Sequence, residues 1–174
     1  MRLGRCSTVA ALIVAPVGLL FWAGSALGIR LNTSPSLPFG LYRVTADSSA
    51  PLVEFCPAEP VATFANVRGY RQAGSCPDGG TPLMKPIVAS EGDVVEVTAA
   101  GVRVNGNLLR NSAPLARDTA GRPLTPSPAG TRRVPHGAVW VISDYHARSF
   151  DSRYFGSVPT ALIRNHLRPL LVLP

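Results

Sequence analysis

The sequence has almost no lysine. Lys85 stands alone beside sixteen arginines in a chain of 174 residues, and it lies within the apolar stretch 82–89. Codon bias in a GC-rich genome explains the scarcity of lysine well, but explains its survival at an apolar site less well. Arginine keeps its proton in proteins, whereas a desolvated lysine can lose it. We therefore interpret Lys85 as a residue whose chemistry requires deprotonation.

Motifs for nucleotide and metal binding are also absent. The chain contains no GxGxxG or Walker pattern and no CxxC pair, and its histidines, His136, His146 and His166, have no ligand spacing. We therefore expect neither a metal ion nor another cofactor. The GxSxG elbow of many serine hydrolases is missing as well. A triad of His136 or His146 with an aspartate, Asp144 or Asp151, is a rival that we favour less than a lysine base.

Acidic residues are few, and the net charge of +7 points to an anionic partner. The arginines are dispersed, with Arg132-Arg133 as the only adjacent pair, and aromatic residues do not alternate with them. This pattern argues against a nucleic-acid-binding protein. For an exported domain, the charge favours a position near anionic membrane lipid, with solvated charge that has no partner as the alternative.

Charge is missing altogether from Cys6 to Ile29. As a helix this run would be about 36 Å long, enough to cross a bilayer. Arg2 and Arg5 precede it and favour a cytoplasmic N-terminus. A cleavable signal peptide is the alternative. We predict a retained anchor, and divide the chain into a cytoplasmic tail (1–7), a transmembrane anchor (8–28) and an exported domain (29–174).

Cysteine is scarce too. Of three cysteines, Cys56 and Cys76 lie in the predicted exported domain, and Cys6 lies at the cytoplasmic edge of the anchor. In an oxidising compartment Cys56 and Cys76 can close one loop, which would stabilise the fold by about 3 kcal/mol. We expect Cys6 to pack or to stay free.

Helix signals are poor beyond residue 30. The chain holds seventeen prolines and sixteen glycines with short apolar runs between them, which is typical of a mainly β domain. We predict strands at residues 41–44, 93–98, 102–104 and 138–142. The last is almost wholly apolar and should be buried on both faces. Asn105-Gly106 should form a hairpin turn. We interpret segments 56–82 and 111–133 as extended loops.

Prolines before and after Ser36 restrict the backbone there and exclude regular helix. A serine held in this way presents its hydroxyl at a fixed angle, but it is a poor nucleophile until a base takes its proton. Lys85 can be that base if desolvation lowers its pKa by ~3 units from ~10.4, a cost of ~4 kcal/mol. An ion pair with Glu91 or Asp93 is the alternative role for Lys85, and spacing alone leaves both open.

Polar residues are dense in segment 143–159, immediately after the predicted strand 138–142. Asp151 and Arg153 can form an ion pair that fixes this segment. Ser149 can hydrogen-bond an amine and orient it. A polar turn without further role is the simpler interpretation for any one of these residues.

Together these segments resemble the type I signal peptidases, the membrane-anchored Ser/Lys endopeptidases, and most closely their TraF-type branch of conjugative-transfer peptidases. The resemblance rests on the serine box at 34–38, on Lys85 with the Gly-Asp-Val-Val sequence at 92–95, and on segment 149–159, in this order along the chain. It implies a signal-peptidase-like β-barrel or sandwich with one N-terminal transmembrane helix. It also implies a bacterial inner-membrane protein whose catalytic domain lies in the periplasm.

The resemblance assigns roles to individual residues. It implies Ser36 as the nucleophile and Lys85 as the general base, with the Ser34 hydroxyl and the Ser36 N–H supporting the oxyanion. It also implies that Ser149 orients the lysine amine. Asp151 and Arg153 would form a supporting salt bridge, and Asp144 would be a structural carboxylate.

The function implied is a serine endopeptidase that processes a conjugative pilin precursor or another membrane-associated preprotein, in some systems with cyclisation. Two departures from the housekeeping enzymes favour a dedicated substrate. Lys85 is followed by proline instead of arginine, and Ser-Glu-Gly-Asp at 90–93 replaces their Gly-x-Pro-Gly-Asp turn. A general signal peptidase is the alternative enzyme, and a non-catalytic structural component of a mating channel is the alternative from another class.

Overall fold

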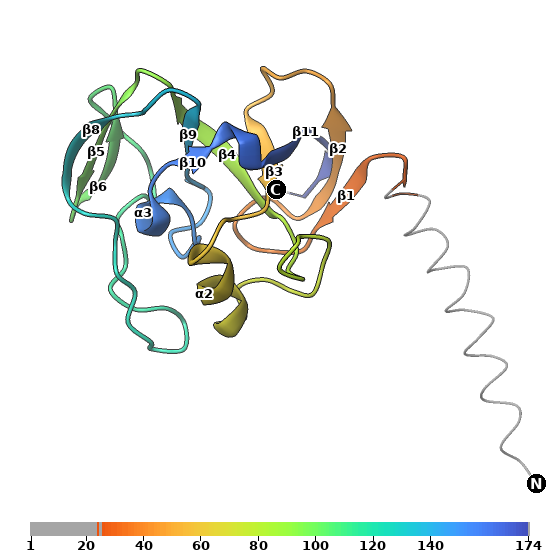
Figure 1. The fold of residues 1–174 in the computed structure, drawn as a ribbon, viewed down its shortest axis with the longest axis horizontal. Helices are drawn as coiled ribbons and strands as arrows, with labels where there is room; N and C mark the ends of the chain where they lie inside the picture. Colours follow the sequence, from red (N-terminus) through yellow and green to blue (C-terminus); the bar gives the residue numbers. More distant parts are fainter. Residues whose placement is uncertain (1–23, 25, 174) are drawn as a thin grey trace, which may run out of the picture.

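The computed structural model describes Gly24 and residues 26–173, which form two antiparallel β-sheets with few helices (Figure 1). The larger sheet has the strand order β1-β2-β11-β3-β4-β9-β10, and the smaller has the order β7-β6-β5-β8. The strands are β1 Ile29–Asn32, β2 Gly40–Thr45, β3 Leu52–Phe55, β4 Leu83–Ser90, β5 Val94–Thr98, β6 Gly101–Val104, β7 Asn107–Leu108, β8 Gly130–Arg133, β9 Ala138–Val141, β10 Val158–Pro159 and β11 Ile163–Val172. The helical elements are α2 Val61–Val67, α3 Ser152–Phe155 and the 3-10 turn η1 Thr160–Leu162. The prediction of a mainly β fold is confirmed.

The predicted tail (1–7) and nearly all of the predicted anchor (8–28) lie outside the described residues. Over Gly24 and residues 26–173, none of the helices combines the length and the apolar character that crossing a bilayer requires.

Strand β9 is the centre of the core, because both of its faces are buried. Trp140 packs with Val95 and Val97 of the smaller sheet in one apolar cluster. Val139 and Val141, on the opposite face, pack with β3 in a second cluster. The prediction that this strand is buried on both sides is therefore confirmed.

One turn and one close contact between strands explain the residues found at these positions. Asn105 and Gly106 both have positive φ, 48° and 85°, and join β6 to β7 as the predicted hairpin. Gly40 begins β2 with φ 143°, and a Cβ there would lie 2.1 Å from the carbonyl oxygen of Leu171. Only glycine allows β2 and β11 to pair this closely at that position.

The prediction of an extended loop over 56–82 is wrong for Val61–Val67, which form helix α2. This helix is too short to show a clear helical period in the sequence, and it buries only Ala62 and Ala65. Segment 111–133, the second predicted loop, ends in strand β8 from Gly130 onward. The rest of that segment has a single bridge, between Arg117 and Pro123.

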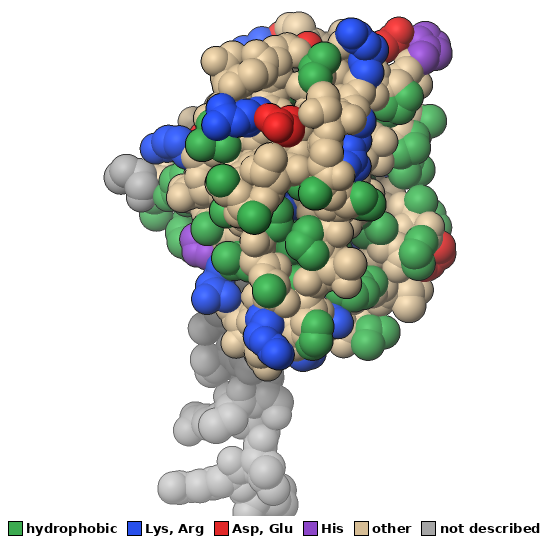
Figure 2. Space-filling view, turned by 90° about the vertical axis from the view of Figure 1, so that its left-hand side faces the viewer, with side chains coloured by type: hydrophobic (Ala, Val, Ile, Leu, Met, Phe, Trp, Pro, Cys, Tyr) green, Lys and Arg blue, Asp and Glu red, His purple; other side chains and the backbone are tan. Residues whose placement is uncertain are grey.

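The surface mixes charge and apolar side chains. On the face shown in Figure 2, arginine side chains are spread out and apolar side chains lie between them. The larger sheet, which extends in Figure 1 from β9 and β10 near the centre to β1 at the right, carries the strands that hold the candidate site.

Candidate active site

The loop between β1 and β2, residues 33–39, presents Ser36 and is called the serine loop below. The side chain of Asn32, at the end of β1, fixes this loop through four hydrogen bonds to its backbone. Its Nδ2 donates to the carbonyl oxygens of Ser34 (3.0 Å), Leu37 (3.1 Å) and Pro38 (3.1 Å), and its Oδ1 accepts from the Ser34 N–H (3.2 Å). The loop conformation is therefore fixed by side-chain hydrogen bonds in addition to its prolines.

Strand β4 brings Lys85 to the serine loop. Its Nζ lies 2.8 Å from Ser36 Oγ, although 49 residues separate them in sequence. Both side chains are buried, with 4% of Lys85 and 8% of Ser36 exposed. The pKa of Lys85 is lowered to about 8, chiefly because the side chain is buried; the nearby Asp151 charge acts to raise it and the Arg153 charge acts to lower it. The amine is therefore neutral in part at mildly alkaline pH.

The alternative ion pairs of Lys85 do not form. Asp93 accepts hydrogen bonds from the Ser90 N–H and from Asn105 instead. Glu91 pairs with His136, 2.7 Å away at the surface. The nearest polar partner of Lys85 is thus a hydroxyl and not a carboxylate.

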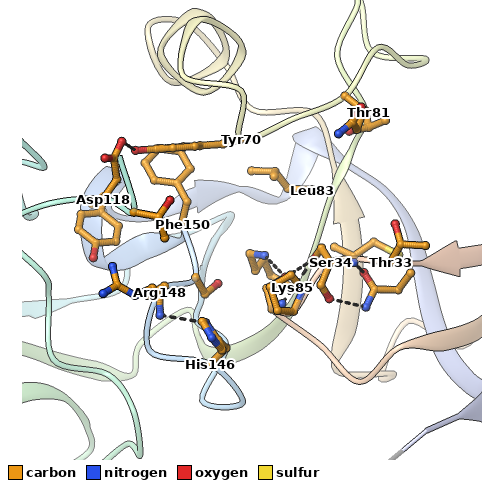
Figure 3. Close-up of a pocket in the computed structure, with 18 of the residues that line it drawn as sticks. Thr33, Ser34, Tyr70, Thr81, Leu83, Lys85, Asp118, His146, Arg148 and Phe150 are labelled. Carbon is orange, nitrogen blue, oxygen red and sulfur yellow. Dashed lines mark hydrogen bonds between the residues drawn. The ribbon is translucent and has the colours of Figure 1, made fainter. Parts of the chain in front are cut away.

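Ser34 extends this contact. Its Oγ lies 2.8 Å from Ser36 Oγ and accepts a long hydrogen bond from the Ser36 N–H at 3.4 Å. The amine of Lys85 and the two hydroxyls form one hydrogen-bonded chain, and Figure 3 shows Lys85 directed at the serine loop beside Ser34. The structure brings together these three residues singled out in the sequence.

Asp151 and Arg153 form a bidentate ion pair with both side chains fully buried, at 2.8 Å for each of the two contacts. The guanidinium also donates to the carbonyl oxygens of Asn111, Ala147 and Ser149. A buried pair with its remaining donors satisfied is costly to break from one side. It therefore fixes the backbone of the loop that precedes α3.

Sequence reasoning missed Ser143, which connects this pair to the serine loop. The Ser143 hydroxyl donates to the carbonyl oxygen of Ser36, 107 positions earlier. Its N–H donates to Asp151 Oδ2 at 3.1 Å. Asn32 was missed as well, because an asparagine before a Ser-Pro turn is common in loops of any function.

Ser149 and Asp144 do not make the contacts that the resemblance implied for them. The Ser149 hydroxyl is buried and has no hydrogen-bond partner among the described residues, so its expected bond to the Lys85 amine is not made here. It does line the same cavity as Lys85. Asp144 lies at the surface, half exposed, with its nearest ion-pair partner Arg110 at 3.7 Å. It does not join the buried groups.

A cavity of about 550 Å³ opens onto Ser36 and Lys85. Its walls come from five segments that are distant in sequence: 31–36, 70–72, 81–85, 115–124 and 146–154. Figure 3 shows Tyr70, Asp118 and Phe150 on one side of this cavity and the serine loop on the other. The cavity is large enough for several residues of an extended peptide.

The rival catalytic groups do not assemble. His136 lies at the surface against Glu91, and His146 uses Nδ1 to accept from the N–H of Arg148. Neither forms a described hydrogen bond with Ser36. Within the part of the chain that the structure covers, no three His, Cys, Asp or Glu side chains are grouped as metal ligands.

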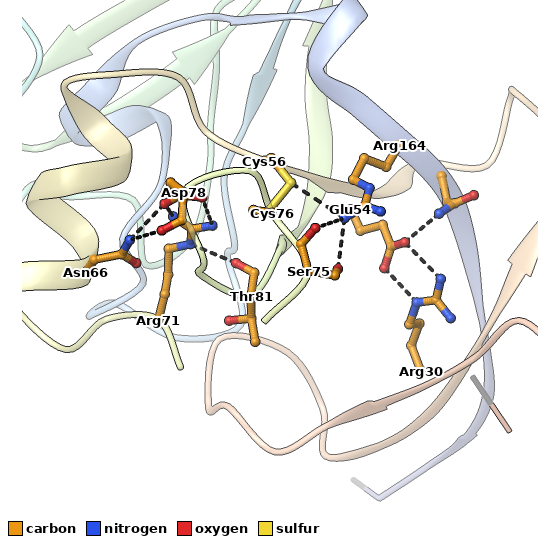
Figure 4. The surroundings of a disulfide bond; sticks show 11 residues. Arg30, Glu54, Cys56, Asn66, Arg71, Ser75, Cys76, Asp78, Thr81 and Arg164 are labelled. Carbon is orange, nitrogen blue, oxygen red and sulfur yellow. Dashed lines mark hydrogen bonds and ion pairs between the residues drawn. A yellow bond between two sulfur atoms is a disulfide. The ribbon is translucent and has the colours of Figure 1, made fainter. Parts of the chain in front are cut away.

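Cys56 and Cys76 are joined in a disulfide, with their Cα atoms 5.6 Å apart (Figure 4). Cys56 follows β3 directly, and Cys76 lies in the loop that leads to β4. Arg164 of β11 donates to the carbonyl and hydroxyl oxygens of Ser75 beside it, at 3.1 and 2.9 Å. The disulfide thus closes the segment that carries α2 and ends near Lys85.

A sequence model described as signal peptidase, peptidase S26, matches residues 2–170. The plasmid transfer protein TraF of Escherichia coli is 41% identical over 170 residues, which cover 93% of this chain and 94% of that protein. A probable conjugal transfer protein TraF of Sinorhizobium fredii is 39% identical over 160 residues, covering 88% and 81%. Among solved structures, a signal peptidase I from Enterococcus faecalis matches with a TM-score of 0.39 and 21% identity, over 72% of this chain and 99% of that chain.

Proposed function

The chain belongs to the signal peptidase family, peptidase S26, and from this premise we propose that it is a serine endopeptidase in which Lys85 activates Ser36. The observation that carries the proposal is the 2.8 Å contact between Lys85 Nζ and Ser36 Oγ in a buried site. Its relatives named for plasmid and conjugal transfer support a signal-peptidase-like role in conjugation.

The first step transfers the Ser36 hydroxyl proton to the neutral Lys85 amine while Oγ attacks the peptide carbonyl carbon. The Ser36 N–H and the Ser34 hydroxyl stabilise the resulting oxyanion. The carbon–nitrogen bond then breaks, and the protonated Lys85 gives its proton to the leaving amine. Water, or the amine of another chain end, then attacks the acyl-Ser36 ester and gives a proton to the neutral Lys85, which passes it to Ser36 Oγ as the ester bond breaks.

The substrate is an extended peptide that lies along β4. In the described ladders β9 pairs with β4 only from Ile87 onward. Residues 83–85 therefore keep one free edge, and all three line the cavity. A peptide that adds to this edge would reach the hydroxyl of Ser36 with its backbone.

The natural substrate we propose is a pilin precursor or another membrane-associated preprotein, cut by an inner-membrane enzyme whose catalytic domain lies in the periplasm. The disulfide between Cys56 and Cys76 supports an oxidising compartment. The uncharged run from Cys6 to Ile29 supports an anchor near anionic lipid. We expect no nucleic-acid partner.

Plasmid transfer between cells tests this function. Ser36→Ala should abolish transfer and leave the pilin unprocessed, whereas Ser48→Ala, at an exposed turn, should leave both at the wild-type level. Normal transfer in Ser36→Ala cells would instead identify a structural component of the mating channel. Rescue of a host that lacks its housekeeping signal peptidase would favour the general enzyme over the dedicated one.

A further inference from the structure

The cavity beside Ser36 has an excess of positive charge. Lys85, Arg117 and Arg148 line it, and Asp118 is the one acidic residue among its described lining. Two arginines and one carboxylate thus face a peptide that enters this cavity.

Asp118 is committed to other partners. Its carboxylate accepts from the Tyr70 hydroxyl (2.6 Å), the Arg122 Nε (2.7 Å) and the Arg122 N–H (2.9 Å), and Arg68 lies 3.6 Å away. Burial acts to raise the pKa of Asp118, but the hydrogen bonds from Tyr70 and Arg122 outweigh it and hold the pKa well below its usual range. This carboxylate fastens segment 115–124 to Tyr70 and does not pair with Arg117 or Arg148.

Hydrogen bonds fix the backbone on both sides of Arg148. It lies between Ala147 and Ser149, whose carbonyl oxygens both accept from the buried Arg153. Its N–H donates to His146 Nδ1 at 3.2 Å. The side chain is exposed, and its guanidinium pairs with no carboxylate of residues 26–173. Figure 3 shows it on the wall of Asp118 and Phe150, across the cavity from Ser34.

Arg117, which precedes Asp118 in sequence, lines the same cavity. Its Nη1 donates to the Gly121 carbonyl oxygen at 2.7 Å, within the turn that Asp118 fastens. The Leu115 N–H donates to the Tyr154 hydroxyl at 3.0 Å and secures the start of this segment. The Arg117 side chain is exposed and, like Arg148, has no carboxylate partner in the described chain.

We propose that Arg148, assisted by Arg117, forms a substrate subsite that selects a peptide with a carboxylate within a few residues of the cleaved bond. The planar guanidinium fork matches a carboxylate in two parallel hydrogen bonds. The carboxylate comes either from an acidic side chain or from the free C-terminus of the substrate. This inference rests on the proposed peptidase function and adds a substrate class to it.

The test uses purified full-length protein and a positional set of internally quenched peptides. Each position around the cleaved bond carries Glu or its isostere Gln, and each peptide ends in a free acid or an amide. Wild type should cleave a Glu peptide about 2- to 5-fold faster in kcat/KM than its Gln counterpart at one position, the range expected for an exposed ion pair. The preference should shrink in high salt. A preference for the free acid over the amide instead identifies the chain end.

Arg148→Gln should remove this preference, and Arg148→Glu should shift it to Lys at the same position. Arg148→Lys keeps the charge without the fork and should show an intermediate preference, while thermal unfolding confirms that each variant is folded. Arg103→Gln is the matched control, because Arg103 is exposed on β6, which contributes no residue to the cavity. It should retain the full preference.

Equal cleavage of all four peptide types by wild type would overturn the carboxylate subsite and leave the peptidase function intact. A preference that persists in both Arg148→Gln and Arg117→Gln would overturn its assignment to these arginines. If wild type cleaves no peptide in the set, this result would contradict the proposed peptidase function and with it the proposed subsite.

Discussion

At the scale of single residues, the protonation state of Lys85 controls the chemistry we propose. The base must be neutral, and its pKa is lowered to about 8 by burial. We therefore expect kcat/KM to rise about tenfold per pH unit up to pH 8 and to level off above it. The measurement is the rate of peptide cleavage between pH 6 and pH 9.5. A rate that does not change over this range would argue against a lysine base.

The same shift affects stability. The folded-state pKa of about 8 lies below the ordinary lysine value of 10.5, so between these values the unfolded chain holds a proton that the folded chain has released. The free energy of unfolding should therefore rise with pH, by about 2–3 kcal/mol between pH 7 and pH 10 relative to Lys85→Met. Denaturant titrations of both proteins check this. Parallel pH curves for the two would contradict a depressed pKa.

Ser143 is expected to position the nucleophile, since its hydroxyl donates to the carbonyl oxygen of Ser36. Ser143→Ala leaves that buried carbonyl without its donor and should lower kcat about 5-fold with little change in KM. Ser143→Thr, which restores the hydroxyl, should recover most of the rate. Equal losses in both variants would indicate a packing defect instead.

At the scale of elements, the disulfide closes the segment from β3 to β4 across a sequence separation of 20 residues. Replacing Cys56 and Cys76 together by alanine should lower the free energy of unfolding by about 3 kcal/mol. Thermal or denaturant unfolding measures the loss, and reduced wild-type protein is the control. Unchanged stability of the double variant would show that packing alone holds the segment.

Elements differ in how far the sequence predicted them. Strands β2, β5, β6 and β9 lie where apolar runs and turn residues predicted them. Strand β11, the longest, was missed because Pro169 and its charged residues argue against a strand. The structure accommodates that proline at a bulge in the pairing with β2. Helix α2 was missed because seven residues are too few to establish a period.

Some residues of the candidate site could be predicted from the sequence and others could not. Lys85 and Ser36 could be found from sequence because each is unusual in its local context, a lone lysine among apolar residues and a serine between prolines. Ser143 and Asn32 could not, since their roles depend on backbone carbonyls that only the folded chain brings near. The partners of Asp118 likewise come from distant segments, at Tyr70 and Arg122.

At the scale of the whole molecule, the larger sheet assembles one site from distant parts of the chain. The β1–β2 loop supplies a hydroxyl, β4 supplies an amine, and the loop after β9 supplies a buried ion pair that is linked to the serine loop through Ser143. Within a family whose members cut peptides, this assembly leads to our central claim that a neutral lysine activates a serine at the β4 edge.

The most direct test of that claim is the mass of the candidate pilin in cells that carry wild type, Lys85→Ala or Lys85→Arg. The arginine side chain is similar in length to that of lysine, but its guanidinium stays protonated and cannot act as a base. Mass spectrometry should therefore find the mature pilin only with wild type and the uncut precursor with both variants. Mature pilin in the Lys85→Arg cells would contradict the account.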